Sequence, residues 1–335
     1  MEHAGSNLSR DPRQYGISNT RNDHNLTNNI HGHSNTNIGN VSNSYNNTNT
    51  INVGVDEGSS QIKAWLSPLE PDIRHRHVSN GRLDGVGDWV LQRNEFEAWY
   101  GSQDGLGDPT LLCYGGQGVG KTFIRYHIPL DLREMLIWGE ISSLVIERLG
   151  KRPCGGGNSV ALYLYCDYQA QKDQSAVNMI GSLLSQVALG TRHIPSEIQR
   201  AFEESQRGRH PLRLPDMLKL FTKTVSSIER AYICFDAIYE LLPANRSELL
   251  RALRQIIRDA PNIRLFLTGR PYIRGELDKY LTKGAYIIHI LADQGDIARY
   301  VSRKIDEDDD RDPDLMPDYL KHDILKTMLE KASEM

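Results

Sequence analysis

Residues 110–122 read TLLCYGGQGVGKT, and the rest of the chain is organised around this stretch. Its first five residues form a short apolar run that ends at a pair of glycines, which predicts a buried strand. The next eight residues, 115–122, match the pattern G-x-x-x-x-G-K-[ST], and a helical pattern follows them. A strand, a glycine-rich turn and a Lys-Thr pair in this order predict a phosphate-binding loop.

The residue types in this loop are the ones that phosphate binding needs. Glycines let the backbone curl so that its N–H groups point at phosphate oxygens, and the helix N-terminus adds its positive dipole end. Lys121 supplies a positive charge to the β- and γ-phosphates, and the Thr122 hydroxyl is a ligand for Mg²⁺. The predicted ligand is ATP or GTP with Mg²⁺, bound by Gly115, Gly116, Gly118, Val119, Gly120, Lys121 and Thr122.

Four more apolar runs have the length of buried strands, and helical patterns lie between them. The runs are 160–166, 231–236, 263–268 and 285–290, and the helical patterns are 175–189, 214–228 and 246–260. Strands that alternate with helices form a parallel sheet covered on both faces, and near-continuous apolar strands agree with burial on both sides. The sequence therefore predicts an α/β fold of the P-loop NTPase type, a three-layer sandwich with a mainly parallel five-stranded sheet.

Polar residues follow two of these runs, at the edge where parallel sheets bind ligands. Asp236 ends the run AYICFD, and we expect it to hold Mg²⁺ together with Thr122. Glu240 lies four residues later and is predicted to orient or deprotonate the attacking water. Arg270, in the segment LFLTGRP, is predicted to reach the γ-phosphate. The predicted catalytic residues are therefore Asp236, Glu240 and Arg270, and the predicted metal ligands are Thr122 and Asp236.

The composition of the whole chain argues against several classes of protein. Its 335 residues include 39 Lys and Arg and 43 Asp and Glu, and this net charge of −4 argues against a nucleic-acid-binding protein. No apolar stretch approaches the ~18 residues of a membrane span, and the N-terminal residues lack the pattern of a signal peptide. The four cysteines form no C-x-x-C pair, so we expect reduced, buried thiols in a cytoplasmic protein without membrane contact.

The first 60 residues differ in composition from the rest, because they hold 14 asparagines and the remaining 275 residues hold 6. Their scarcity of aliphatic residues predicts disorder. Between residues 19 and 52, however, ten of twelve positions spaced three apart are asparagine, which suits self-association through stacked Asn ladders. We expect this tract, 1–60, to precede a helical lead-in at 61–109, a nucleotide-binding core at 110–292 and a helical segment at 293–335.

Residues 64–292 resemble the NACHT domains of fungal NOD-like receptors, also described as nephrocystin-3-like N-terminal domains. The matching blocks, in the family's order, are WLSPLEPDIRH, RLDGVGDWVLQRNEFEAW, LLCYGGQGVGKTFI, LYLYCDYQAQKDQSAVNMIGSLLSQV, ICFDAIYEL and IRLFLTGRPYIRGEL. The resemblance implies a STAND-type signalling ATPase or GTPase that forms a homo-oligomer with nucleoside triphosphate, in immune-like or incompatibility signalling. It also implies that residues 82–89 lie over the nucleotide base.

The resemblance further implies a winged-helix module and sensor repeats beyond the core, and neither is present in this sequence. The chain is thus expected to be truncated before the winged helix. Without a sensor, the Asn-rich tract becomes the expected contact for a downstream protein. The alternative interpretation is a non-hydrolysing scaffold or adaptor whose Asn-rich tail mediates self-assembly.

Two further features depart from the family's pattern. The family's D-A-L-D-E reads D-A-I-Y-E at 236–240, and a tyrosine cannot act as a base near pH 7, so we expect tight binding with slow hydrolysis. Residues 125–140 interrupt the helix after the phosphate loop, and Pro129 should stop that helix near His127, with a restart near Leu130. This segment is either a genuine insertion or translated intron sequence, and the lack of an evident partner for its apolar residues favours the second.

Two charged stretches are predicted to be solvated. The acidic run DEDDDRDPD at 306–314 reads as a loop before a helical pattern at 318–335. The basic cluster at 74–77, Arg-His-Arg-His, reads as an exposed helix end.

Overall fold

The computed structural model describes residues 57–102, 107–115, 135–151, 158–190, 194–208, 212–281, 284–290, 294–311 and 317–333. All of them belong to one compact unit, Asn52–Met335. The asparagine-rich tract, apart from its last four residues, lies outside the described part of the chain. The same is true of residues 116–134, which include most of the phosphate loop and the first part of the predicted interruption. The predictions for these segments stay predictions.

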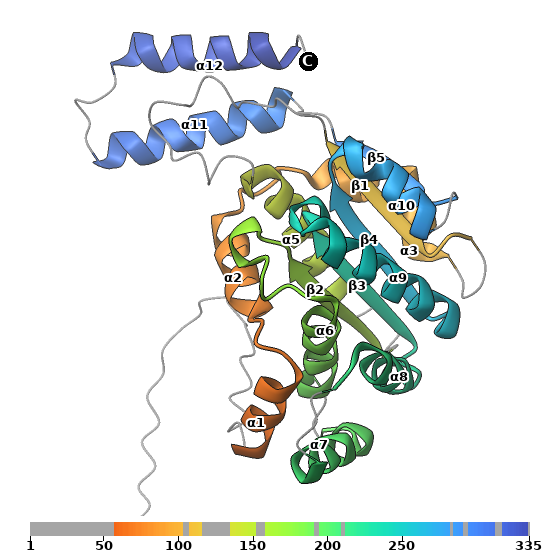
Figure 1. The fold of residues 1–335 in the computed structure, drawn as a ribbon. Coiled ribbons are helices and arrows are strands. Elements are labelled where there is room, and N and C mark those ends of the chain that lie inside the picture. Colours follow the sequence, from red (N-terminus) through yellow and green to blue (C-terminus); the bar gives the residue numbers. More distant parts are fainter. Residues whose placement is uncertain are drawn as a thin grey trace, which may run out of the picture. The chain divides into compact units, whose positions relative to one another are not determined.

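Five strands form one sheet in which all neighbours run parallel (Figure 1). The strands are β1 (Thr110–Gly115), β2 (Ser159–Tyr165), β3 (Arg230–Asp236), β4 (Ile263–Gly269) and β5 (Tyr286–Ile290). Their order across the sheet is β2-β3-β4-β1-β5. The apolar runs predict these strands to within one residue at each end, because a strand buried on both faces has to be apolar throughout. The predicted α/β fold is confirmed, and the sheet is parallel throughout.

The point where the connections diverge lies at β1. The chain leaves β1 for the edge strand β2, and it later passes β1 again on its way from β4 to β5. Ligands bind open α/β sheets beyond the carboxyl ends of the strands, at such a divergence. The register places Gly115 beside Ile290, and Tyr114 beside Gly269. The start of the phosphate loop therefore lies between the ends of β4 and β5.

Helices surround the sheet. The α-helices are α1 (Glu57–Leu66), α2 (Pro71–Gly81), α3 (Asn94–Gly101), α5 (Met135–Gly150), α6 (Ala176–Gly190), α7 (Ser196–Gly208), α8 (Leu214–Val225), α9 (Pro243–Asp259), α10 (Arg274–Tyr280), α11 (Gln294–Arg311) and α12 (Asp318–Ser333). Four short 3-10 helices are described: η1 (Asp88–Gln92), η3 (Tyr168–Ala170), η4 (Ile238–Glu240) and η5 (Pro271–Ile273).

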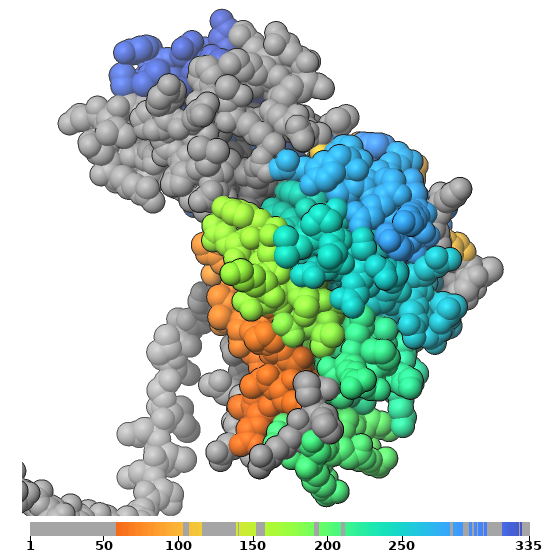
Figure 2. Space-filling model, in the orientation of Figure 1, coloured from red at the N-terminus to blue at the C-terminus, as the bar shows by residue number. Residues whose placement is uncertain are grey.

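Two apolar cores lie on the two faces of the sheet. One core joins α1, α6, α8, α9 and α10 to strand residues such as Leu112 and Leu265. The other joins η1, α3 and α5 to strand residues such as Leu111 and Phe266. Neighbouring residues of one strand thus point into opposite cores, as the pleat requires, and the result is the predicted three-layer sandwich. In the space-filling view the helices of the first face close over the sheet (Figure 2).

One helix differs from the sequence-based expectation, and a second covers the end of the predicted interruption. Helix α11 continues to Arg311, so the prediction of a loop is wrong for residues 306–311. A helix already nucleated by the amphipathic residues before it adds further residues at little cost, even where aspartate is a poor helix former. Helix α5 begins at Met135, so residues 135–140 are continuous with 141–150, and Gly139 lies against Val78 of α2.

Two expectations drawn from composition can be compared with the described residues. Cys113, Cys166 and Cys234 are free and buried, as predicted. In the described part of the chain, none of the helices combines the length and the apolar character that crossing a membrane requires.

Candidate functional site

Asp236 ends β3 and is almost completely buried, with 8% of its surface exposed. Its Oδ1 accepts hydrogen bonds from the Ser142 hydroxyl on α5 at 2.5 Å and from the Thr268 hydroxyl on β4 at 2.7 Å. Burial raises the pKa of the Asp236 carboxyl above its ordinary value, and these two donors oppose the rise because they stabilise the charged form. A helix on one side and a strand on the other therefore fix the orientation of the carboxylate.

The chain turns sharply directly after Asp236. Ala237 has a φ of 53°, and it is the single non-glycine residue with a left-handed backbone in the described part of the chain. Its N–H donates to the Thr268 hydroxyl at 2.8 Å, so Thr268 serves Ala237 and Asp236 at once. Strained turns of this kind persist only where the surroundings hold them, and they concentrate at functional sites.

Glu240 closes the short turn η4 that follows. The backbone N–H of Tyr168 donates to Glu240 Oε2 at 3.2 Å, and the Gln171 side chain donates to the Glu240 carbonyl at 2.6 Å. Burial raises the pKa of Glu240 to about 7, and the Tyr168 N–H opposes this rise. A carboxyl group that is half protonated near neutral pH is matched to proton transfer, so Glu240 has the acidity of a general base.

Arg270 follows the end of β4 and lies against an aromatic ring. Its guanidinium carbon is 4.7 Å from the centroid of the Tyr239 ring. Tyr239 in turn meets Tyr272 edge to face, with ring centroids 6.5 Å apart. A cation–π contact of this kind is worth about 0.5–2 kcal/mol. Tyr239 therefore holds Arg270 beside η4.

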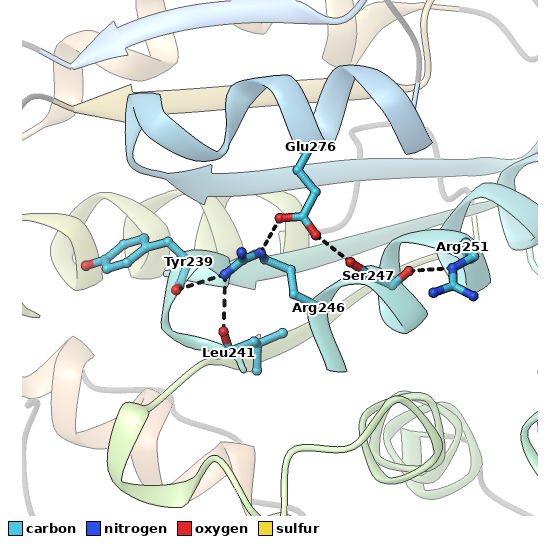
Figure 3. A network of polar contacts seen from close by, with 6 residues as sticks. All are labelled: Tyr239, Leu241, Arg246, Ser247, Arg251 and Glu276. Carbon is cyan, nitrogen blue, oxygen red and sulfur yellow. Dashed lines mark hydrogen bonds and ion pairs between the residues drawn. The ribbon is translucent and has the colours of Figure 1, made fainter. Parts of the chain in front are cut away.

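The buried side chain of Arg246 is hydrogen-bonded to backbone carbonyls in and after η4 (Figure 3). Arg246 on α9 donates to the carbonyls of Tyr239 and Leu241, each at 3.2 Å, and pairs with Glu276 of α10 at 2.7 Å. Ser247 donates to the other carboxylate oxygen of Glu276, also at 2.7 Å. The network ties η4 to two helices, so the position of Glu240 depends on packing far from the sheet edge.

Helix α2 brings further polar groups to the end of β2. His75 Nδ1 lies 2.8 Å from the hydroxyl of Tyr165, which is the register partner of Asp236. Burial lowers the pKa of His75, and the charge of Arg74 favours the ionised form of Asp236. The prediction that residues 74–77 form a solvated cluster is wrong for His75, because one face of α2 packs on the sheet and on α5.

The three predicted catalytic residues lie at one edge of the sheet. Asp236 ends β3 and Glu240 follows it, and Arg270 follows β4, the strand between β3 and β1. Gly115 is described at the end of β1, whereas the other predicted phosphate-binding residues lie outside the described residues: Gly116, Gly118, Val119, Gly120, Lys121 and Thr122.

Sequence reasoning missed two residues that hold the site together, Ser142 and Thr268. Thr268 was detectable in principle, because a polar residue that ends one strand run lies beside the acidic residue that ends the neighbouring run. Ser142 had only a weak signal, a serine in the middle of an apolar helix, since its partner is 94 residues away.

The donor set at this edge suits a hard cation that is shared with phosphate. Within the described residues, no three His, Cys, Asp or Glu side chains cluster as a metal cage. Magnesium does not need one, because it binds commonly through one or two carboxylates and the phosphates of its nucleotide. The fixed carboxylate of Asp236 fits that role, and Glu240 offers a second acidic group nearby.

Comparisons with known proteins match more than half of the chain to one domain family. A family model described as nephrocystin 3, N-terminal, matches residues 85–270. The Walker-type ATPase PABY2304 of Pyrococcus abyssi is 15% identical, with a TM-score of 0.40 over 68% of this chain and 60% of that chain. The ORC1 protein of Aeropyrum pernix, solved in complex with DNA, is also 15% identical, with a TM-score of 0.37 over 73% of this chain and 53% of that chain. No curated protein matches the chain.

Proposed function

The chain belongs to the nephrocystin 3 N-terminal family of P-loop NTPase domains, and from this premise we propose that it is a nucleotide-dependent signalling switch. It binds ATP or GTP with Mg²⁺, hydrolyses the nucleotide slowly, and forms a homo-oligomer in the triphosphate state. Its setting is fungal immune-like or incompatibility signalling of the NACHT type in the cytoplasm. The Asn-rich tract is the contact for a downstream protein.

One observation carries the proposal. The buried carboxylate of Asp236, the Thr268 hydroxyl that fixes it and the start of the phosphate loop at Gly115 lie on three adjacent strand ends. A phosphate cradle, an acidic ligand for a cation and a carboxyl group tuned to neutral pH are the parts that phosphoryl transfer needs. This edge holds the two carboxyl groups beside Gly115, the residue at which the predicted phosphate cradle begins.

Each residue has a defined task in the proposed reaction. The loop amides and Lys121 hold the β- and γ-phosphates, while Thr122 and Asp236 would hold Mg²⁺, which when bound neutralises phosphate charge. Glu240 accepts a proton from the water that attacks the γ-phosphorus, and the diphosphate leaves with the electrons of the broken P–O bond. Arg270 stabilises the charge that develops on the γ-phosphoryl group.

Two features support slow turnover. Tyr239 supplies no second carboxylate beside Glu240, and burial raises the pKa of its own hydroxyl still further above neutrality. The same ring holds Arg270 through a cation–π contact, which has to break before Arg270 can reach a phosphate. Both features lower the rate of hydrolysis without weakening the phosphate loop.

The test compares nucleotide binding and mass in solution for three full-length chains: wild type, Lys121→Ala and Lys219→Ala. Lys219 is exposed on α8 and provides the matched charge-removing control. We expect the wild type and Lys219→Ala to bind nucleotide and to gain mass with a non-hydrolysable triphosphate but not with the diphosphate. Lys121→Ala should do neither, and nucleotide binding that survives this substitution refutes the proposal.

The scaffold alternative rests on the same tyrosine, because a domain that has lost an acid at position 239 can keep its fold without regulated hydrolysis. It predicts that Lys121→Ala assembles as well as the wild type does. Assembly that depends on triphosphate in the wild type and disappears in Lys121→Ala excludes the scaffold.

A further inference from the structure

Helix α11 is hydrogen-bonded to the segment that runs from the loop after α2 into η1. Asp296, in the first turn of α11, accepts two hydrogen bonds at Oδ2, from the backbone N–H of Gly87 at 3.0 Å and from the Trp89 indole N–H at 3.1 Å. One turn later Arg299 donates to the carbonyl of Gly85 at 2.8 Å. These five residues, Gly85, Gly87, Trp89, Asp296 and Arg299, are called the latch below. Residues more than 200 positions apart in the chain are thus joined at three points.

The loop is also confined on its other side. Gly85 and Gly87 have φ values of 79° and 80°, a backbone conformation that side chains disfavour. A Cβ on Gly85 would meet the Arg299 guanidinium at 3.0 Å, and a Cβ on Gly87 would meet Ile141 of α5 at 3.1 Å. The positive φ values favour glycine at both positions, and the loop lies close to α11 at Gly85 and close to α5 at Gly87.

Helices α5 and α11 are both connected to the candidate site. Ile141 precedes Ser142, whose hydroxyl donates to Asp236. Asp296 lies six residues after Ile290, the residue that ends β5 and pairs with Gly115 at the start of the phosphate loop. The latch thus lies between α11, which follows β5 in the chain, and α5, whose Ser142 orients Asp236.

We propose that Asp296 is a positioning residue that closes the loop 85–89 at the nucleotide edge and thereby slows the release of bound nucleotide. The inference rests on the proposed function, since it assumes that nucleotide occupies this edge. The latch holds α5 in the position in which Ser142 reaches Asp236, and bound nucleotide favours that same position. By linkage the coupling is reciprocal, so bound nucleotide also stabilises the first turns of α11.

The experiment measures the dissociation of fluorescent mant-ADP or mant-GDP from the full chain in Mg²⁺, together with hydrogen exchange of residues 85–92 and 294–301. The variants are Asp296→Ala, Asp296→Asn and the control Asp306→Asn, which removes the same charge from an exposed position on the same helix. We expect Asp296→Ala to release nucleotide about tenfold faster, because two hydrogen bonds to a charged acceptor are lost. Asp296→Asn keeps an acceptor oxygen and should release nucleotide about threefold faster than the wild type. Asp306→Asn should release it at the wild-type rate.

Hydrogen exchange separates a coupling from a simple tether. In the wild type, nucleotide should slow exchange in residues 294–301, and in Asp296→Ala that protection should disappear. Faster exchange of the loop with unchanged release overturns the proposal, as does release from Asp296→Ala and Asp296→Asn at the wild-type rate. If Asp296→Ala does not fold, the threefold effect of Asp296→Asn against Asp306→Asn decides. A wild-type chain that binds neither nucleotide overturns the proposed function itself, whereas tight binding without the Asp296 effect overturns only the latch.

Discussion

Replacing Thr268 by valine should destabilise the protein by about 3 kcal/mol, although the two side chains have nearly the same shape. The Thr268 side chain is 1% exposed, and its hydroxyl donates to Asp236 while it accepts from the Ala237 N–H. A hydrogen bond to a charged group contributes about 1.5–3 kcal/mol, and a buried N–H left without an acceptor costs about 1–3 kcal/mol. The estimate of about 3 kcal/mol lies in the lower part of the summed range because the two contacts share one hydroxyl and are not independent.

The prediction also has a pH dependence. The folded-state pKa of Asp236 is raised, so its contribution to stability is fully present below the unfolded pKa of about 3.9 and is lost as pH rises through the folded value. Removing the Thr268 donor raises that folded pKa further. The stability difference between Thr268→Val and the wild type should therefore grow as pH rises from 4 to 8.

Urea unfolding at several pH values provides the measurement, with two controls. Thr268→Ser keeps the hydroxyl and removes a buried methyl group, which costs about 1 kcal/mol. Thr224→Val also removes a buried hydroxyl. Among the hydrogen bonds described, that hydroxyl donates only to the Leu220 carbonyl of its own helix, so its loss should lower the free energy of unfolding by less than about 1 kcal/mol. The reasoning is refuted if Thr268→Val is no less stable than Thr268→Ser, or if its deficit does not change with pH.

Three more predictions concern the same edge. The hydrolysis rate should rise with pH around the Glu240 pKa of about 7, because the general base must be ionised. In Glu240→Gln this rise should be absent. The same rise in the variant contradicts the role of Glu240 as the base. Tyr239→Leu should speed single-turnover hydrolysis several-fold by releasing Arg270, whereas Tyr239→Phe, which keeps the ring, should not; equal rates in both variants remove Arg270 from the explanation. Arg246→Met should lower the free energy of unfolding by about 3 kcal/mol in thermal or urea unfolding, because Glu276 keeps a half-buried charge without its partner. Adding Glu276→Leu should recover more than half of that loss. A double variant as unstable as the single one argues that the carbonyl contacts of Arg246 matter more than the ion pair.

The sheet was predictable from sequence because its strands are short, mostly apolar runs, and the three inner strands β1, β3 and β4 are buried almost throughout. The place of Asp236 was predictable for the same reason, since a charged residue that ends an apolar run has to lie at the ligand edge of a parallel sheet. These are local properties of the chain, and no knowledge of distant partners is needed to read them.

The residues that the sequence concealed all depend on partners far away in the chain. Thr268 acquires its role from Asp236 and Ala237 across a strand pair, and Ser142 acquires its role through the docking of a helix. His75 looked like one residue of an exposed basic cluster, and only the packing of α2 against β2 shows that its ring meets Tyr165. Hydropathy patterns describe which face is buried, but they do not describe which buried polar groups find each other.

The place of β1 in the sheet has a consequence for the order of events during synthesis. Thr110 pairs with Leu265 on one side, and Leu111 pairs with Tyr286 on the other, so both neighbours of β1 are made long after β1 itself. At ~5–20 residues per second, the 155 residues between Thr110 and Leu265 take roughly 8–30 s to appear. Strands β2 and β3 can pair with each other in that interval, whereas β1 waits with unpaired edges on both sides, an arrangement that invites association with other chains. The nucleotide edge is therefore completed last, and a nascent chain acquires its capacity to bind only when nearly all of its core has been made.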